Sequence, residues 1–136
     1  MEKGKIICDT DVLIDYFETD KIRHVQTKEI VEDVIELDNV TLSIITKMEL
    51  LTGAFNKAEL RLLNKNIHRL NILLIKPEIS LIASELIEEY NLSHNLAIPD
   101  AKVAATAMYA GMDLFTYNQK DFRYIKGLRL YEMKSS

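Results

Sequence analysis

Short apolar runs alternate along this chain with longer segments in which apolar residues recur every three or four positions. This alternation predicts strands separated by helices, and therefore a parallel sheet with helices on both faces. We expect an α/β fold, a three-layer α/β/α sandwich around a central, mostly parallel sheet of about five strands. The expected strands cover residues 5–9, 40–45, 72–75, 113–117 and 128–131.

The segments between these strands are expected to be helical. Pro77 and Pro99 each suit the first turn of a helix, where the missing amide hydrogen costs nothing. Asp20 is a suitable N-cap for the helix before the second strand, and Thr46 begins the helix after it. The remaining expected features are the end of that helix near Gly53, a helix over 56–70, a polar loop over 91–95 and a helical turn over 119–122.

The bulk composition fits one compact domain. The chain has 136 residues, of which 48% are hydrophobic, enough for a single core. We expect one domain over residues 1–132, followed by a frayed tail over 133–136. A single cysteine, Cys8, excludes an intramolecular disulfide. The sequence has no apolar run long enough to span a membrane and no signal-peptide pattern, so we expect a cytoplasmic protein.

Four acidic residues occupy positions where an α/β fold places binding residues. Asp9, Glu49 and Asp121 each follow an expected strand, and Asp100 lies in the first turn after Pro99. In open parallel sheets, ligands bind beyond the carboxyl ends of the strands. Carboxylates that converge there repel each other unless a cation lies among them. The pattern therefore indicates a divalent metal and phosphate chemistry.

Each acid also has a purely structural interpretation. Asp9 is a possible helix cap, and Thr46-x-x-Glu49 matches a capping box in which Glu49 bonds back to the backbone. Asp100 is acceptable as an ordinary first-turn acid, and Asp121 as a turn residue. Taken as a set, the four acids favour a site.

Basic residues offer a second, weaker signal. The formal net charge of −4 argues against a broad electrostatic grip on nucleic acid but leaves local contacts open. Lys57 and Arg61 begin a stripe of basic residues that recur every four positions. Such a stripe is more typical of a solvated helix face. Lys47 and Lys102, which neighbour the acids in sequence, are better candidates for contacts with substrate phosphates.

Together with their flanking residues, the acids resemble the PIN domain, especially the short VapC-type ribonuclease toxins of type II toxin–antitoxin pairs. The resemblance extends from Ile6 to about Tyr131. Each matching segment is weakly specific alone, but four in order are strongly specific. The segments are 7–14 (ICDTDVLI), 43–50 (SIITKMEL), 99–107 (PDAKVAATA) and 116–122 (TYNQKDF).

The resemblance implies a metal-dependent endoribonuclease that hydrolyses RNA phosphodiester bonds. Asp9 and Asp100 would be the main ligands of Mg²⁺ or Mn²⁺, and Glu49 and Asp121 would complete the catalytic acids. Thr46 and Thr116 would hold carboxylates or metal-bound water by hydrogen bonds, and Asn118 would be a further supporting residue. The resemblance also implies a cognate antitoxin protein as partner, and a homodimer.

Other functions remain open from the residues alone. Asp9-Thr10-Asp11 matches the opening motif of haloacid-dehalogenase-like phosphatases, in which Asp9 would be the nucleophile and Asp11 the acid/base. That fold is usually longer than this chain and has a later pair of acids that this sequence lacks. A PIN domain that binds RNA or a partner without cleaving is a further alternative, because Asn118 is neutral where the family commonly has an acid. A non-enzymatic receiver-like scaffold fits the order of residues poorly.

Overall fold

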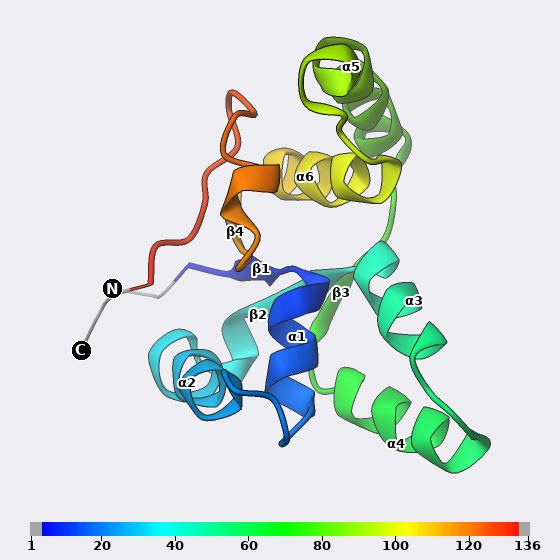
Figure 1. The fold of residues 1–136 in the computed structure, drawn as a ribbon, viewed down its shortest axis with the longest axis vertical. Helices are drawn as coiled ribbons and strands as arrows, with labels where there is room; N and C mark the ends of the chain where they lie inside the picture. The colour runs from blue at the N-terminus through cyan, green and yellow to red at the C-terminus, as the bar shows by residue number, and fades with distance from the viewer. Residues whose placement is uncertain (1–3, 134–136) are drawn as a thin grey trace.

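The computed structural model describes residues 4–133, which build a parallel sheet with helices on both faces (Figure 1). The sheet has four strands in the order β3-β2-β1-β4, and every neighbouring pair is parallel. The three-layer α/β/α prediction is therefore confirmed. The strands are β1 (Ile6–Cys8), β2 (Val40–Ser43), β3 (Asn71–Leu73) and β4 (Asp113–Phe115).

Each crossover between parallel strands contains helices. Between β1 and β2 lie α1 (Thr10–Phe17), α2 (His24–Glu29), a π-helical segment (Ile30–Ile35) and a 3₁₀ turn (Leu37–Asn39). Between β2 and β3 lie α3 (Ile44–Thr52) and α4 (Lys57–Ile67), and between β3 and β4 lie α5 (Pro77–His94) and α6 (Ile98–Ala110). A 3₁₀ turn, η3 (Gln119–Asp121), follows β4. No helix in the described part of the chain is long and apolar enough to cross a membrane.

The order of the strands reverses at β1. The chain goes from β1 outward to β2 and β3, then returns to place β4 on the other side of β1. Crossovers on the two sides of such a point diverge and leave a crevice at the carboxyl ends of the two central strands. Cys8 is paired with Phe115 there, so the residues that follow these two positions meet at the crevice.

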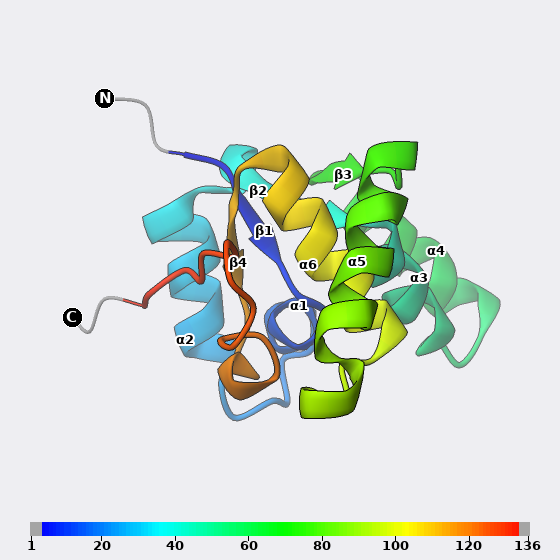
Figure 2. The same ribbon diagram turned by 90° about the horizontal axis from the view of Figure 1, so that it is seen from above.

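Alternating strand residues face two separate apolar cores. Ile7 and Leu114 are fully buried among residues of α5 and α6, and Cys8 and Phe115 are fully buried on the other side among residues of α1 and α4. Figure 2 shows α6 lying across β1, with α5 next to it. The small side chains of α6, such as Ala104, are buried completely, which is why this helix lies close to the sheet.

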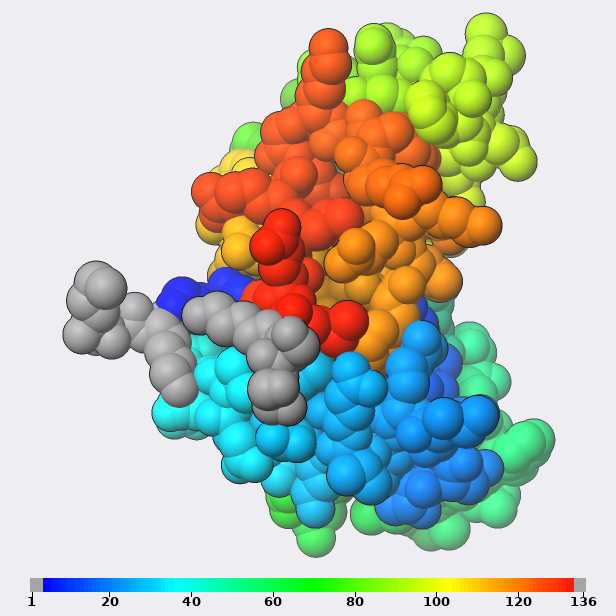
Figure 3. Space-filling model, turned by 60° about the vertical axis from the view of Figure 1, so that its left-hand side comes forward, coloured from blue at the N-terminus to red at the C-terminus, as the bar shows by residue number. Residues whose placement is uncertain are grey.

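The expected fifth strand reduces to one contact, so the prediction of about five strands was one too many. Leu130 forms an isolated parallel bridge with Leu114, supported by hydrogen bonds from Leu114 N to Arg129 O (2.9 Å) and from Tyr131 N to Leu114 O (2.8 Å). Gly127 turns the chain with a φ of 87° just before this contact. Figure 3 shows the chain after β4, in orange and red, lying over the surface next to the yellow-green of α5.

Two expected helix starts were wrong. Asp20 does not cap α2, which begins at His24. The helix after β2 begins at Ile44 instead of Thr46, because the Ser43 side chain is the N-cap and accepts a hydrogen bond from Thr46 N (3.1 Å). The capping-box interpretation of Glu49 is excluded by the same observation.

The expected polar loop over 91–95 was also wrong, because α5 continues to His94. The helix ends at Asn95, which adopts the left-handed conformation with a φ of 52°. Asparagine tolerates this conformation better than most residues. Of the expected frayed tail over 133–136, only Met133 lies within the described residues.

Candidate active site

Asp9 is the most constrained acid of the site. It is the N-cap of α1, and only 7% of its surface is exposed. Oδ1 accepts a hydrogen bond from Thr10 N (2.8 Å), and Oδ2 accepts one from the buried hydroxyl of Thr116 (2.9 Å). Thr116 Oγ1 also accepts a hydrogen bond from Asn118 N (3.1 Å). The residues that follow β1 and β4 are thus joined through one carboxylate.

Asp11 anchors the same loop from the next position. Its Oδ2 accepts a hydrogen bond from Tyr117 N (3.0 Å), and its Oδ1 accepts one from Val12 N (2.8 Å). Arg23 lies over the Tyr117 ring, with its guanidinium carbon 3.9 Å from the ring centroid, and its Nε bonds Asp15 Oδ2 (2.7 Å). Both oxygens of Asp11 are engaged by backbone amides, so this side chain does not match the free acid/base that a phosphatase needs.

Glu49 is linked to the site through Thr10. The Thr10 hydroxyl donates to Glu49 Oε1 at 2.6 Å, and it lies 3.3 Å from the Thr46 hydroxyl. Thr10 is the residue after Asp9 on α1, whereas Thr46 and Glu49 belong to α3. This contact brings the carboxylate that follows β2 to the edge where Asp9 lies.

Asp100 and Asp121 form the more open side of the site. Asp100 lies in the first turn of α6, as predicted, and Asp121 ends η3. Both residues line one hollow, which His94, Lys120 and Tyr124 also border. Asp100 is half-buried and Asp121 is exposed. The described residues donate no side-chain or backbone hydrogen bond to either carboxylate.

The acids interact electrostatically across the crevice. Burial and the neighbouring Asp11 carboxylate raise the pKa of Asp9 to about 7, with a smaller contribution from Asp100. Burial raises the pKa of Asp100 to about 6, together with the carboxylates of Asp121, Glu49 and Asp11. The neighbouring carboxylates therefore make ionisation of Asp9 and Asp100 more costly. The charges of the four catalytic candidates predicted from the sequence therefore interact, because Asp100 is coupled to Asp9, Glu49 and Asp121.

The donor set suits a hard divalent cation only in part. Within residues 4–133, no three His, Cys, Asp or Glu side chains are close enough together to hold one ion. Mg²⁺ usually takes only one or two protein carboxylates and completes its shell with water and phosphate oxygens. Asp9 and Asp100 meet that smaller requirement in chemistry, since they are carboxylates and mutually repulsive.

None of the predicted phosphate contacts forms a salt bridge with the acids within residues 4–133. Lys102 follows Asp100 by two positions, and residues two apart on a helix do not face the same way. Lys102 instead lines a mainly apolar hollow with Ile75 and Ile98. Lys57 and Arg61 are exposed on α4. These contacts, with Lys47 on α3, stay predictions to which the geometry adds no support.

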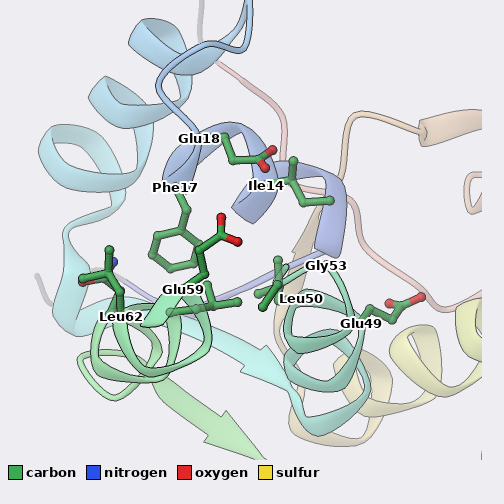
Figure 4. Close-up of a pocket in the computed structure, with 11 residues that line it drawn as sticks. Ile14, Phe17, Glu18, Glu49, Leu50, Gly53, Glu59 and Leu62 are labelled. Carbon is green, nitrogen blue, oxygen red and sulfur yellow. The ribbon is translucent and has the colours of Figure 1, made fainter. Parts of the chain in front are cut away.

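An apolar groove borders the site, and Glu49 is one of the residues that line it. It runs between α1, α3 and α4 and is lined by side chains such as Ile14, Phe17 and Leu62. Figure 4 shows Glu18 and Glu49 at its edges and the Glu59 side chain near the middle of the lining residues. Leu62 remains 60% exposed. The groove thus combines an uncovered apolar floor with acidic edges next to the site.

Several residues of the site carried no clear signal in the sequence. Arg23 and Tyr117 are far apart along the chain, and only the fold brings the guanidinium onto the ring. Thr10 was not predicted as a site residue, although its place directly after Asp9 at the start of a helix was a usable signal. Tyr124 was likewise close in sequence to a predicted acid, since it follows Asp121 by three residues.

Comparison with known proteins agrees with this architecture. Residues 6–128 match the family described as the PIN domain. The chain is 30% identical over 135 residues to a protein named Ribonuclease VapC1 from Methanocaldococcus jannaschii, covering 96% of this chain and 90% of that protein.

Solved structures give the same result. A chain of a toxin–antitoxin complex from Klebsiella pneumoniae superposes with a TM-score of 0.74 and 29% identity, over 95% of this chain and 100% of that one. A chain of a DNA-bound VapBC complex from Salmonella typhimurium superposes with a TM-score of 0.77 at 22% identity, over 94% and 97% of the two chains, which supports the fold alone. None of these comparisons favours a phosphatase. The chain belongs to the PIN-domain family, in its VapC-type group.

Proposed function

We propose that this protein is a divalent-metal-dependent endoribonuclease and the toxin of a type II toxin–antitoxin pair. The observation that carries the proposal is the shared field of Asp9, Asp100, Glu49 and Asp121 at the carboxyl edge of the sheet. The similarity to a protein named Ribonuclease VapC1 supports RNA as the substrate. Since its substrate is RNA, we place its action in the cytoplasm.

The proposed cofactor is Mg²⁺ or Mn²⁺, held by Asp9 and Asp100. When bound, the ion would activate a water molecule and neutralise charge that builds on the phosphate oxygens. Asp9 is already oriented by Thr10 N and the Thr116 hydroxyl, so it needs little rearrangement to act as a ligand. Asp100 receives no hydrogen bond from residues 4–133, so its carboxylate is available to an ion.

The remaining residues position these ligands. Thr116 holds Asp9 and accepts from the backbone of Asn118, which makes the loop after β4 part of the support. Glu49 is fixed by Thr10, whose hydroxyl also reaches Thr46. Asp121 adds negative charge opposite Asp100. In this arrangement Asn118 contributes through its backbone, so its neutral side chain does not weaken the orientation of Asp9.

The test is RNA cleavage by the purified protein. We expect cleavage with Mg²⁺ or Mn²⁺, none with a chelator, and restoration when the ion is added back. Asp113→Asn is the control acid, since Asp113 begins β4 and pairs with Arg129 (2.8 Å) away from the crevice. The proposal fails if the wild-type protein cuts no RNA with either ion.

A cognate antitoxin is the proposed partner, and the apolar groove is its proposed contact. The exposed apolar side chain of Leu62 and the acidic lining residues Glu18, Glu49 and Glu59 suit a segment with apolar and basic side chains. Such a segment would bring a positive charge toward Glu49. Expression of the chain alone should slow growth, co-expression of its antitoxin should restore it, and Leu62→Asp should prevent the restoration.

We also propose a homodimer. Phe55 is 92% exposed and Ile22 fully so, and such large apolar side chains support a protein contact. Light scattering of the isolated protein decides between one and two copies. The Phe55→Ser variant tests whether the segment between α3 and α4 takes part.

A further inference from the structure

A small hollow adjoins the open side of the acidic site. It lies between the end of α5, the start of α6 and the segment after β4, and it encloses about 290 Å³. That volume is just below the range of about 300–1,000 Å³ that is typical of ligand clefts, so the hollow suits a small group. Asp100 and Asp121 form one side of the hollow, and the rings of His94 and Tyr124 border it elsewhere. A small planar group therefore fits next to the carboxylates.

The two rings form a flat platform. The centroids of His94 and Tyr124 are 3.9 Å apart with an interplanar angle of 10°, so the rings are stacked. Tyr90 meets both edge-on, at 5.9 Å from His94 and 5.1 Å from Tyr124. The His94 ring is exposed and Tyr124 is half-buried. An exposed ring on a stacked pair leaves an aromatic surface toward solvent.

The platform is fixed from both of the elements that carry it. His94 Nδ1 lies 2.7 Å from the Ser93 hydroxyl, and the Tyr90 hydroxyl accepts a hydrogen bond from Lys126 N (3.1 Å). The first contact orients the His94 ring within α5, and the second joins the end of α5 to the turn that follows Tyr124. Rigid aromatic surfaces lose little conformational freedom when a ligand binds.

The platform also lies within reach of the acids. Burial raises the pKa of Tyr124, and the carboxylates of Asp100 and Asp121 raise it further. The Tyr124 hydroxyl is thus in the field of the residues proposed to act on the phosphate. Lys120 borders the same hollow and supplies a positive charge. A planar ring system attached to a phosphate is the ligand that matches these features together.

We propose that the hollow receives the unstacked base of a nucleotide next to the scissile phosphate, with His94 and Tyr124 as its stacking platform. Proteins that read single-stranded RNA stack splayed-out bases on aromatic side chains in this way. This inference rests on the proposed ribonuclease function and identifies its substrate as an unpaired strand or loop. It makes the two rings specificity residues for the flanking base.

The first experiment compares cleavage of a pool of single-stranded RNAs by ring variants. We expect Tyr124→Leu and His94→Ala to raise KM about tenfold or more, as loss of a base stack does, to flatten the base preference at one flanking position, and to change kcat little. Tyr124→Phe keeps the ring and should behave as wild type. Tyr109→Leu is the matched control, because Tyr109 is exposed near the opposite end of the same helix pair, beside Lys76.

A second experiment separates the platform from the activity. RNA that carries 2-aminopurine loses fluorescence when this base stacks, so quenching by Asp9→Asn protein with Mn²⁺ reports occupancy without cleavage. We expect quenching with the Asp9→Asn single variant and none after Tyr124→Leu or His94→Ala is added. His94 is exposed, so its variant remains informative if Tyr124→Leu fails to fold.

The outcomes distinguish the two proposals. If wild-type protein cuts RNA while the ring variants keep its KM, base preference and quenching, the platform is overturned and the ribonuclease proposal stands. If wild-type protein cuts no RNA, the ribonuclease proposal fails. In that case the quenching assay still tests the stacking platform. Quenching by Asp9→Asn that is lost when Tyr124→Leu or His94→Ala is added supports the platform, and absence of quenching by Asp9→Asn overturns it.

Discussion

The two sides of the acidic site are built differently. On one side, Asp9 and Asp11 are held by hydrogen bonds to both oxygens of each carboxylate, from Thr10, Thr116, Val12 and Tyr117. On the other side, the carboxylates of Asp100 and Asp121 receive no hydrogen bond from the described residues and border an open hollow. One side is fixed by the protein, and the other keeps its capacity for external ligands.

This difference follows from the sheet. Asp9 and Thr116 continue directly from the two central strands, where Asp9 N donates to Phe115 O (2.9 Å) and extends the ladder. Asp100 and Asp121 come from a helix start and a 3₁₀ turn outside the sheet. The strand side can therefore place a ligand accurately, and the helix side can adjust to the substrate.

The largest effect should come from neutralising one acid on each side. Asp9→Asn and Asp100→Asn should each reduce RNA cleavage by at least about 100-fold, because loss of a ligand exceeds the 10–100-fold loss caused by removing its support. Rates with saturating Mn²⁺, together with circular dichroism to confirm folding, check this. If either variant cuts at the wild-type rate, that side does not hold the ion.

The next effect should come from the support of Asp9. Thr116→Val removes the hydroxyl that donates to Asp9 Oδ2 and accepts from Asn118 N. We expect cleavage or ion affinity to fall by about 10–100-fold, and Thr116→Ser to restore it.

Thr41→Val is the matched control for this change. Thr41 is equally buried, but its hydroxyl is the buried side-chain polar atom that has no hydrogen-bond partner within residues 4–133. Its removal should leave cleavage unchanged and unfolding stability equal or higher, because an unsatisfied buried hydroxyl is destabilising. Equal losses of cleavage in both variants would mean that any threonine deletion in the core disturbs the site.

The positions of the acids were predictable, whereas their support was not. An acid that directly follows an apolar run lies at a strand end, and strand ends of a parallel sheet share one edge. Thr116 could be placed by the same rule. The stack of His94 on Tyr124 and that of Arg23 on Tyr117 join residues that no local pattern connects.

Boundaries failed for a separate reason. Ile44 and Ile45 continue an apolar run and suit a strand or a buried helix equally, so the run alone does not show where the strand ends. The Ser43 side chain decides it by capping α3. Similarly, the polar residues before Asn95 suit a loop by composition. In the structure α5 continues to His94, and the contact between the Tyr90 and Tyr124 rings holds its last turns against the segment after β4.

A smaller effect should appear in the pH dependence of stability without metal. Burial and Asp11 raise the pKa of Asp9 from 3.8 to about 7, so the folded protein binds this proton more tightly than the unfolded chain. Stability should therefore be highest while Asp9 is protonated and should fall as the pH rises from about 4 to about 7. We expect a melting temperature several degrees lower at pH 8 than at pH 5.5 in the presence of a chelator.

The Asp9→Asn variant isolates this contribution. It should show a smaller fall in melting temperature over the same pH range, whereas Asp113→Asn should keep the wild-type fall. An unchanged fall in Asp9→Asn would contradict a strongly raised pKa at this residue. The same experiment on Asp100→Asn should give a weaker change, since the pKa of Asp100 rises only to about 6.

The smallest effect should come from the basic stripe on α4. On this helix Glu59, Leu62 and Asn66 line the apolar groove, and the helical repeat places Lys57 and Arg61 on the opposite side. Their side chains thus face away from Glu49 and the crevice. The double variant Lys57→Ala/Arg61→Ala should change KM less than about twofold and leave its salt dependence unaltered, because lost phosphate contacts would lower that slope by about 0.7 each.

Lys120→Ala provides the contrast, since Lys120 borders the hollow that contains Asp100. It should reduce the salt slope by about 0.7 if it touches one phosphate. KM measured at several salt concentrations for both variants gives the two slopes. A larger change in salt slope from the Lys57/Arg61 variant than from Lys120→Ala would place the RNA path along α4. The side of the site that carries Asp100 and Asp121 would then not be the side that contacts the substrate.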